Sequence, residues 1–309
     1  MTDPATRWPD FFIVGAPRSG TSWLYHALRD HPGAFLPDRK EPHHLSPDLD
    51  GGTAAEAAWR VRDQHDYTAL FQAARRDQRV GEASTGYLAS LAAPARIADV
   101  SPEARIIVLV RDPVEQIASL HARRVAAGVE DLDLRQALDA EPDRLFGRHW
   151  PRRPVFMPQA QYRDGACFIR HIERYAERIG RDAIWVGSLD DIAADAPGTY
   201  QSVLAHLDLA PRDPPQLGRV NQNETVRARR IHRALHAARL DRTLQRVPSP
   251  LRPLAGATLR GARRITRRAG PRPSMPADLR DRLREESRAD VEALGAFLRR
   301  DLIALWWRD

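Results

Sequence analysis

Two short, continuous hydrophobic runs stand out along this chain, and each leads into a helical pattern. They cover 11–14 (Phe-Phe-Ile-Val) and 106–110 (Ile-Ile-Val-Leu-Val). Runs of this length, rich in β-branched residues, are typical of strands covered on both faces, as in a parallel sheet. Between 23 and 28 apolar residues recur at helical spacing, and Pro113 is suited to the first turn of a second helix. The pattern predicts two strand–loop–helix units.

Weaker patterns predict the other elements. They are one or two amphipathic helices in 53–76, a short strand from Arg79 into a polar loop, an irregular segment over 129–158, a helix over 159–179, a strand over 183–188 and a C-terminal helix from Pro276. Alternation of strands and helices favours an α/β fold. We expect one domain with a central parallel β-sheet flanked by helices. Its core would comprise 8–210 and 275–309, with a variable basic insertion at about 240–273.

The loop after the first run has the composition of an anion site at a helix start. Gly15 and Gly20 allow backbone conformations and close approaches that other residues avoid. Unpaired N–H groups and the helix dipole attract an anion there, and the side chains between and after the glycines add donors. These donors are Arg18, Ser19, Thr21 and Ser22. An ordinary strand-to-helix turn is the alternative.

The same loop departs from the pattern of nucleoside triphosphatases. That pattern is G-x-x-x-x-G-K-[ST], in which the lysine contacts the outer phosphates. The glycines and the hydroxyl of Ser22 fit, but Thr21 occupies the lysine position. A triphosphatase is therefore disfavoured.

A second candidate anion site follows the 106–110 run. Arg111 would lie at the carboxyl end of the strand, where open α/β sheets bind their ligands. Ser119 lies about two helical turns further on, within reach of whatever Arg111 holds. The alternative is that Arg111 satisfies a helix cap or pairs with Asp112.

These motifs, in this order, resemble the sulfotransferases that use 3'-phosphoadenylyl sulfate (PAPS), in particular the bacterial and glycan-modifying type. That resemblance implies a P-loop-like nucleotide-binding fold, in which 18–22 hold the 5'-phosphate and Arg111 and Ser119 hold the 3'-phosphate. Trp23 would stack on the adenine or belong to the core. The resemblance covers 11 to about 209 well and 275–307 moderately.

The resemblance also implies the catalytic groups. Lys40-Glu41-Pro42 matches a segment whose glutamate deprotonates the acceptor hydroxyl, so Glu41 ranks first as base, His43 or His44 second, and a metal role for the histidines a distant third. Lys40, the only lysine in the chain, and Arg18 would balance charge on the sulfuryl group. We expect partial burial to raise the pKa of Glu41. No metal is required.

The segment 82–87 resembles one that borders the donor and the acceptor in this family. Glu82 and Tyr87 are therefore candidate substrate contacts, with His43. The match is imperfect, because Ala83 occupies a position at which many members have lysine.

Composition and charge favour some cellular locations and binding partners over others. No apolar run approaches the roughly 20 residues of a membrane span, and the polar N-terminus does not resemble a secretory signal. A single cysteine, Cys167, excludes an internal disulfide and a cysteine-rich zinc site and fits the cytoplasm. A net charge of +7 and a pI near 10.2 favour an anionic partner. The arginine-rich stretch 239–272 would contact an anionic membrane surface or an acidic glycan, or form a solvated insertion.

Together these features predict a sulfotransferase that moves a sulfuryl group from PAPS to a hydroxyl. A saccharide or glycolipid is the first choice of acceptor, and a phenolic or peptide natural product the second. A small-molecule kinase and a basic nucleic-acid-binding protein are the alternatives; we expect no nucleic-acid partner.

Overall fold

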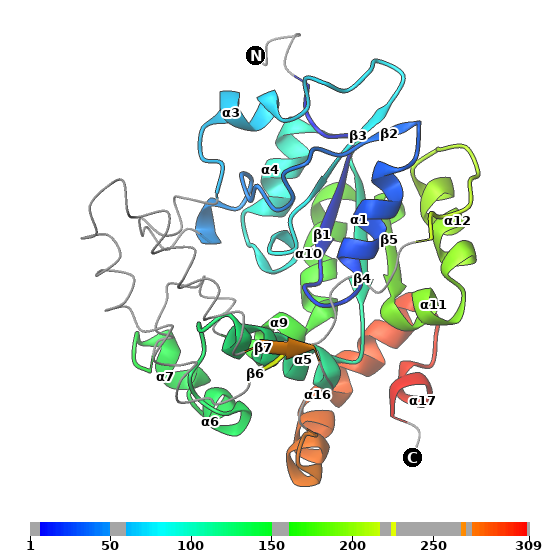
Figure 1. The fold of residues 1–309 in the computed structure, drawn as a ribbon. Helices are drawn as coiled ribbons and strands as arrows, with labels where there is room; N and C mark the ends of the chain where they lie inside the picture. Colours follow the sequence, from blue (N-terminus) through cyan, green and yellow to red (C-terminus); the bar gives the residue numbers. More distant parts are fainter. Residues whose placement is uncertain are drawn as a thin grey trace, which may run out of the picture.

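A five-stranded, fully parallel sheet forms the centre of the computed structural model, which describes residues 7–49, 60–149, 161–216, 224–226, 267–269 and 274–307 (Figure 1). The strand order is β2-β3-β1-β4-β5. Their bounds are β1 Phe11–Gly15, β2 Ala34–Phe35, β3 Arg79–Ala83, β4 Arg105–Val110 and β5 Ile184–Ser188. β1 lies between β3 and β4, so the chain leaves β1 towards one side of the sheet and later returns on the other. Ligands of open α/β sheets bind at the carboxyl ends of the strands at such a reversal.

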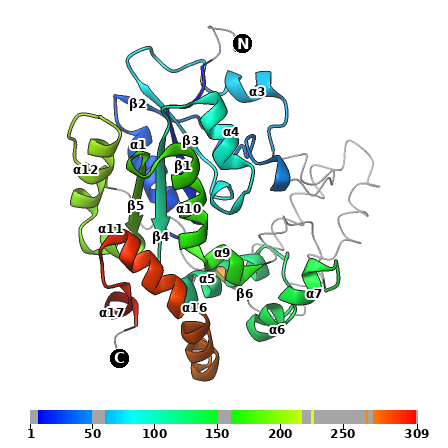
Figure 2. The ribbon, with the colours of Figure 1, turned by 180° about the vertical axis from the view of Figure 1, so that it is seen from behind.

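Side chains of β1 alternate between the two faces of the sheet. Phe11 and Ile13 pack on one face and Phe12 and Val14 on the other, all without exposed surface. Helices α1 (Thr21–Arg29) and α12 (Ala196–His206) cover the first face. The second face is covered by α4 (Ala93–Val100), α5 (Pro113–Ala126), α10 (Phe168–Ile179) and α16 (Ala277–Leu298) (Figure 2). This arrangement confirms the predicted α/β fold with a parallel sheet between two helical layers.

Smaller elements connect these layers. They are η1 Pro47–Leu49, α3 Gln64–Ala69, η2 Tyr87–Ala89, α9 Tyr162–Ala166, η3 Arg181–Ala183, α11 Leu189–Ala194 and α17 Leu302–Trp306. The helix predicted over 159–179 is two helices, α9 and α10, because the backbone at Cys167 leaves the helical region.

The prediction of an irregular segment from residue 129 onward was wrong for its described part. Helices α6 (Leu134–Asp139) and α7 (Glu141–Leu145) lie there. Asp133 and Gln136 form a capping box at the start of α6, a signal the sequence carried. Arg144 on α7 forms a fully buried ion pair of 2.8 Å with Glu130. Residues 150–158 lie outside the described part.

The basic stretch 239–272 lies almost wholly outside the described residues. Only β7 (Arg267–Ala269) belongs to it, and it pairs antiparallel with β6 (Glu224–Val226) beside α5. The predicted membrane or glycan contact of this stretch, like the division into core and insertion, stays a prediction. Among the described helices, none has the length and apolar character needed to cross a membrane.

Candidate active site

The loop from Gly15 to Gly20 connects β1 to α1 and requires both of its glycines. A Cβ on Gly15 would lie 2.7 Å from the Cβ of Leu88, closer than side chains can pack. Gly20 has a φ of 96° and precedes the first residue of α1. The side chains of Ser19 and Thr21 are buried, and Ser22 is half-buried. The nine-residue helix α1 therefore directs the positive end of its dipole towards this loop, as predicted for an anion site.

Direct hydrogen bonds join this loop to the second predicted anion site. The Arg18 Nε donates to the Ser119 Oγ at 3.0 Å, and the Arg111 Nη1 donates to the Arg18 carbonyl at 3.1 Å. Arg111 lies just beyond β4, and Ser119 faces the loop from α5. Both motifs thus lie at the carboxyl edge of adjacent strands, close enough to hold one ligand.

Two C-terminal helices support the start of α5. Asp112 caps α5 through the Val114 N–H at 2.8 Å and accepts a 3.3 Å hydrogen bond from the Trp307 indole. Glu115 lies 3.8 Å from Arg111 and 3.6 Å from Arg280 on α16. The C-terminal segment therefore holds the residues on either side of Arg111's contacts with α5.

Glu41 lies at the same edge of the sheet. Its backbone N–H donates to the Ala83 carbonyl at the end of β3, and β3 is the neighbour of β1. The carboxylate accepts from the Lys40 Nζ at 2.9 Å and the Thr85 Oγ1 at 3.2 Å, and the His43 Nε2 lies 3.3 Å from its Oε2. Because the Thr85 carbonyl lies against Gly15, the carboxylate is near the Gly15–Gly20 loop. Its side chain is 39% exposed and remains accessible.

The expectation of a raised pKa for Glu41 was wrong. Burial acts to raise the pKa, but the hydrogen bond with His43 and the positive charge of Lys40 outweigh it and lower the pKa to about 2. Glu41 is therefore ionised throughout the physiological pH range.

Glu82 and Tyr87, predicted as substrate contacts, have no exposed surface. The Glu82 Oε2 accepts from the Tyr87 hydroxyl at 2.9 Å and from the Tyr67 hydroxyl at 2.7 Å. Burial raises the pKa of Glu82 to about 7 although hydrogen bonds from neighbouring hydroxyls oppose the shift. The prediction that Glu82 and Tyr87 contact the substrate is therefore corrected. Both side chains lie in the core, and the Tyr87 hydroxyl contacts the backbone of Leu45, close in sequence to Glu41. Tyr67 lies within the amphipathic pattern of 53–76, and nothing in the sequence indicates that it contacts Glu82.

The aromatic candidates have different surroundings. Trp23 is partly buried on α1, edge-on to Tyr200, so one part of its surface belongs to the core. Tyr162 on α9 is fully buried and donates to Glu130, so it belongs to the core. His44 stacks on Tyr67 and contacts the Val61 carbonyl, away from the Glu41 carboxylate. His43 is thus the histidine that accompanies Glu41.

Among the described residues, one group of three side chains lies close enough together to bind a metal ion. They are Asp63, His65 and Asp66, all exposed, and the Asp63 carboxylate already caps α3. Lys40, Arg18 and Arg111 instead give the candidate active site the cationic character that suits an anionic ligand.

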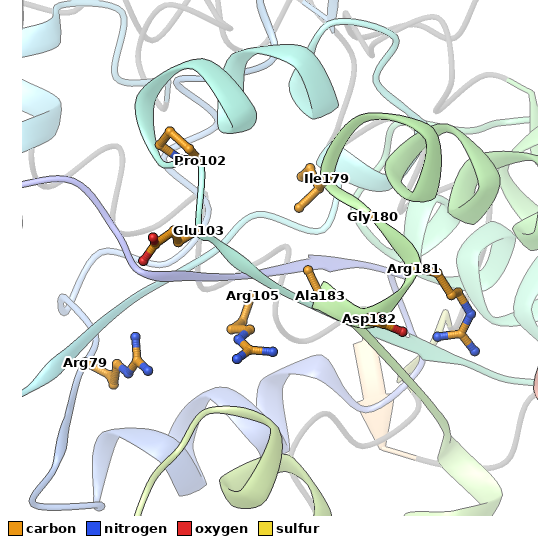
Figure 3. A pocket seen from close by; sticks show the side chains of 9 residues that line it. All are labelled: Arg79, Pro102, Glu103, Arg105, Ile179, Gly180, Arg181, Asp182 and Ala183. Carbon is orange, nitrogen blue, oxygen red and sulfur yellow. The ribbon is translucent and has the colours of Figure 1, made fainter.

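A pocket of about 480 Å³ opens at the amino ends of the strands, opposite the carboxyl ends where the candidate active site lies (Figure 3). Three arginines are among its lining residues, with Arg105 between Arg79 and Arg181 in this view. Asp208 pairs with both Arg79 and Arg105, at 2.9 and 3.5 Å. This pocket is separate from the candidate active site, because it lies where β3 and β4 begin.

The parallel sheet flanked by helices, with a glycine loop between β1 and α1, defines a P-loop-like α/β fold. The model of the sulfotransferase family matches residues 9–213, and the chain belongs to this family. A crystal structure of a sulfotransferase from Alicyclobacillus acidocaldarius is 25% identical, with a TM-score of 0.73 over 98% of this chain and 100% of that one.

Curated relatives match a shorter part of the chain. Heparan sulfate glucosamine 3-O-sulfotransferase 6 of Mus musculus is 32% identical over 120 residues, which are 39% of this chain and 32% of the relative. Membrane-associated sulfotransferase kil1 of Dictyostelium discoideum is 28% identical over 111 residues, which are 36% of this chain and 22% of the relative. The matches thus span about a third or less of these relatives.

Proposed function

We propose that this sulfotransferase transfers the sulfuryl group of PAPS to an acceptor hydroxyl, with Glu41 as general base. The observation that carries the proposal is the hydrogen-bonded link between the Gly15–Gly20 loop and the Arg111 motif, because a donor with phosphates at both ends of its adenosine needs two anion sites at one edge of the sheet. In this assignment 18–22 hold the 5'-phosphate, and Arg111 and Ser119 hold the 3'-phosphate.

In the proposed reaction Glu41 accepts the hydroxyl proton as the acceptor oxygen attacks sulfur in line. The bond between sulfur and the bridging phosphate oxygen breaks, and adenosine 3',5'-bisphosphate leaves with the electron pair. Lys40 and Arg18 stabilise negative charge on the transferred group and the bridging oxygen, as in phosphoryl transfer.

A carboxylate with a pKa of about 2 is a weak base, and donor binding would strengthen it. Lys40 holds the Glu41 carboxylate at 2.9 Å, and an anionic donor nearby competes for the same ammonium. Loss of that contact and the added negative charge both raise the pKa of Glu41. Donor binding and base activation are thus coupled through Lys40.

Binding of adenosine 3',5'-bisphosphate tests this proposal. We expect calorimetry to show binding that needs no Mg²⁺ and exceeds that of ATP. Preference for Mg-ATP would favour the kinase alternative, and strongly salt-dependent binding of a polynucleotide would favour the nucleic-acid alternative.

The acceptor is proposed to be a saccharide or glycolipid hydroxyl. This proposal draws on the names of the relatives, which include heparan sulfate glucosamine 3-O-sulfotransferases. A panel of oligosaccharides, glycolipids and phenols, assayed with ³⁵S-labelled PAPS, would identify it. Labelling of phenols alone would contradict the glycan assignment.

The pH profile provides a second prediction. Because the pKa of Glu41 in the free enzyme is about 2, kcat/KM should show no limb from this residue between about pH 4 and pH 8. Replacing His43 by phenylalanine removes a contact that lowers this pKa, so an acid limb should move upward. In profiles extended below about pH 4, an acid limb at the same pH in His43→Phe and in the parent would contradict the coupling of His43 to the base.

The C-terminal support of α5 gives a third prediction. Trp307→Phe removes the hydrogen bond to Asp112, so calorimetry should show about two- to tenfold weaker binding of adenosine 3',5'-bisphosphate. Trp306→Phe is the matched control, since its indole bonds to Asp190 beyond β5. An equal loss of affinity in both variants would mean that the C-terminal segment stabilises the fold as a whole and not the start of α5 in particular.

A further inference from the structure

Residues 41–45 approach the reaction centre in an unfavourable backbone conformation. Glu41 and His43 have φ values of 61° and 51°, in the left-handed region that non-glycine residues rarely adopt. Such conformations persist only when surrounding contacts hold them. The segment contains the candidate base, so these contacts determine where the carboxylate lies.

The contacts come from the segment after β3. The Ser84 Oγ accepts the His43 N–H at 3.0 Å, and the Tyr87 hydroxyl accepts the Leu45 N–H at 2.9 Å. The Tyr87 ring also packs edge-on against His43. Two backbone amides on the carboxyl side of Glu41 are therefore held by side chains.

Glu82 in turn fixes the Tyr87 hydroxyl. A phenol that accepts from an amide is oriented when its own proton has a defined acceptor, and the Glu82 Oε2 supplies one at 2.9 Å. Tyr67 donates to the same oxygen, and its ring stacks on that of His44. Glu82 thus contacts Tyr87, and Tyr87 contacts the backbone of Leu45 in segment 41–45.

We propose that Glu82 is a positioning residue that acts through Tyr87 to hold segment 41–45, and with it the Glu41 carboxylate, in the reactive geometry. The proposal rests on the proposed role of Glu41 as base. Tyr67 also holds Glu82, and it contacts the segment through its ring, which stacks on His44.

The two tyrosines form a matched pair for the test. Tyr87→Phe and Tyr67→Phe each remove one hydroxyl from Glu82, but only Tyr87→Phe leaves the Leu45 amide without its acceptor. Hydrogen exchange of the peptide that covers 41–45 should accelerate about tenfold or more in Tyr87→Phe and less than about twofold in Tyr67→Phe. This measurement needs neither donor nor acceptor, so it stands if the proposed function fails.

A kinetic readout separates positioning from general destabilisation. With ³⁵S-labelled PAPS and the panel member that gives the highest transfer, kcat should fall about tenfold or more in Tyr87→Phe and in Glu82→Gln. The affinity for adenosine 3',5'-bisphosphate should stay within about twofold of the parent in both. The carboxamide keeps the shape of Glu82 but accepts the two hydroxyls without a charge.

The pH dependence of kcat adds a further readout. Groups facing Glu82 are Tyr67 from α3, Tyr87 from η2, Tyr175 from α10 and the Glu41 charge, with His43 beyond Tyr87. An ionised Glu82 binds the hydroxyls more strongly, so kcat should rise through about pH 7 in the parent and lose this rise in Glu82→Gln. A rise retained in Glu82→Gln would come from another group and count against the proposal. Equal exchange in the two tyrosine variants, or a loss of bisphosphate affinity with kcat, would overturn it.

Discussion

Glu41→Gln should reduce sulfuryl transfer by about a hundred- to ten-thousandfold, the range typical of removing a general base. The amide cannot take the proton from the acceptor hydroxyl, although it occupies nearly the same volume. Initial rates with ³⁵S-labelled PAPS would measure the loss. Adenosine 3',5'-bisphosphate should bind at least as tightly as it binds the parent, because loss of the carboxylate charge leaves the Lys40 ammonium available to an anionic ligand.

His44→Asn is a suitable comparison, because His44 is three residues away but contacts Tyr67 and the Val61 carbonyl. Its transfer rate should remain within a few-fold of the parent. A Glu41→Gln enzyme with nearly full activity would contradict the assignment of Glu41 as general base and favour His43 in that role. The reverse result, a severe loss in His44→Asn alone, would exclude Glu41 as base.

The strand and helix on either side of the Gly15–Gly20 loop could be predicted closely from the sequence. The apolar run before Gly15 predicts a strand, which is β1. The helical spacing between 23 and 28 predicts a helix, which is α1 from Thr21 to Arg29. Buried parallel strands and glycine-bounded helix starts are set by local sequence, so their signals survive without tertiary information. The proximity of Arg111 to the loop followed from the rule that parallel strands present their carboxyl ends together, and the Arg111–Arg18 hydrogen bond agrees with it.

Properties that depend on distant neighbours were harder to predict. The pKa of Glu41 was expected to rise because the sequence showed a carboxylate near a core, but it cannot show that Lys40 and His43 turn towards it. Glu82 was expected to face substrate, yet Tyr67 reaches it across 15 residues of sequence. A side chain's direction depends on the packing of several elements, and the sequence pattern carries little information about it.

Removing the Arg111 guanidinium should selectively weaken binding of the nucleotide that carries a 3'-phosphate. Arg111→Met keeps the aliphatic stem but loses the charged, forked donor. Charge-assisted hydrogen bonds contribute about 1.5–3 kcal/mol each, so losing two would weaken binding of adenosine 3',5'-bisphosphate by about a hundredfold or more. Calorimetry measures this change directly, whatever the acceptor.

Arg111 also donates to the Arg18 carbonyl, so its loss could disturb the loop as well as the phosphate contact. Adenosine 5'-phosphate separates the two effects, because it has the 5'-phosphate but not the 3'-phosphate. If Arg111 reads the 3'-phosphate, Arg111→Met should bind the bisphosphate and the monophosphate with nearly equal affinity, whereas the parent prefers the bisphosphate. If the variant lost both ligands in equal proportion, Arg111 would support the loop rather than recognise the phosphate. The selectivity ratio, more than either affinity, therefore decides whether the two anion sites hold opposite ends of one nucleotide.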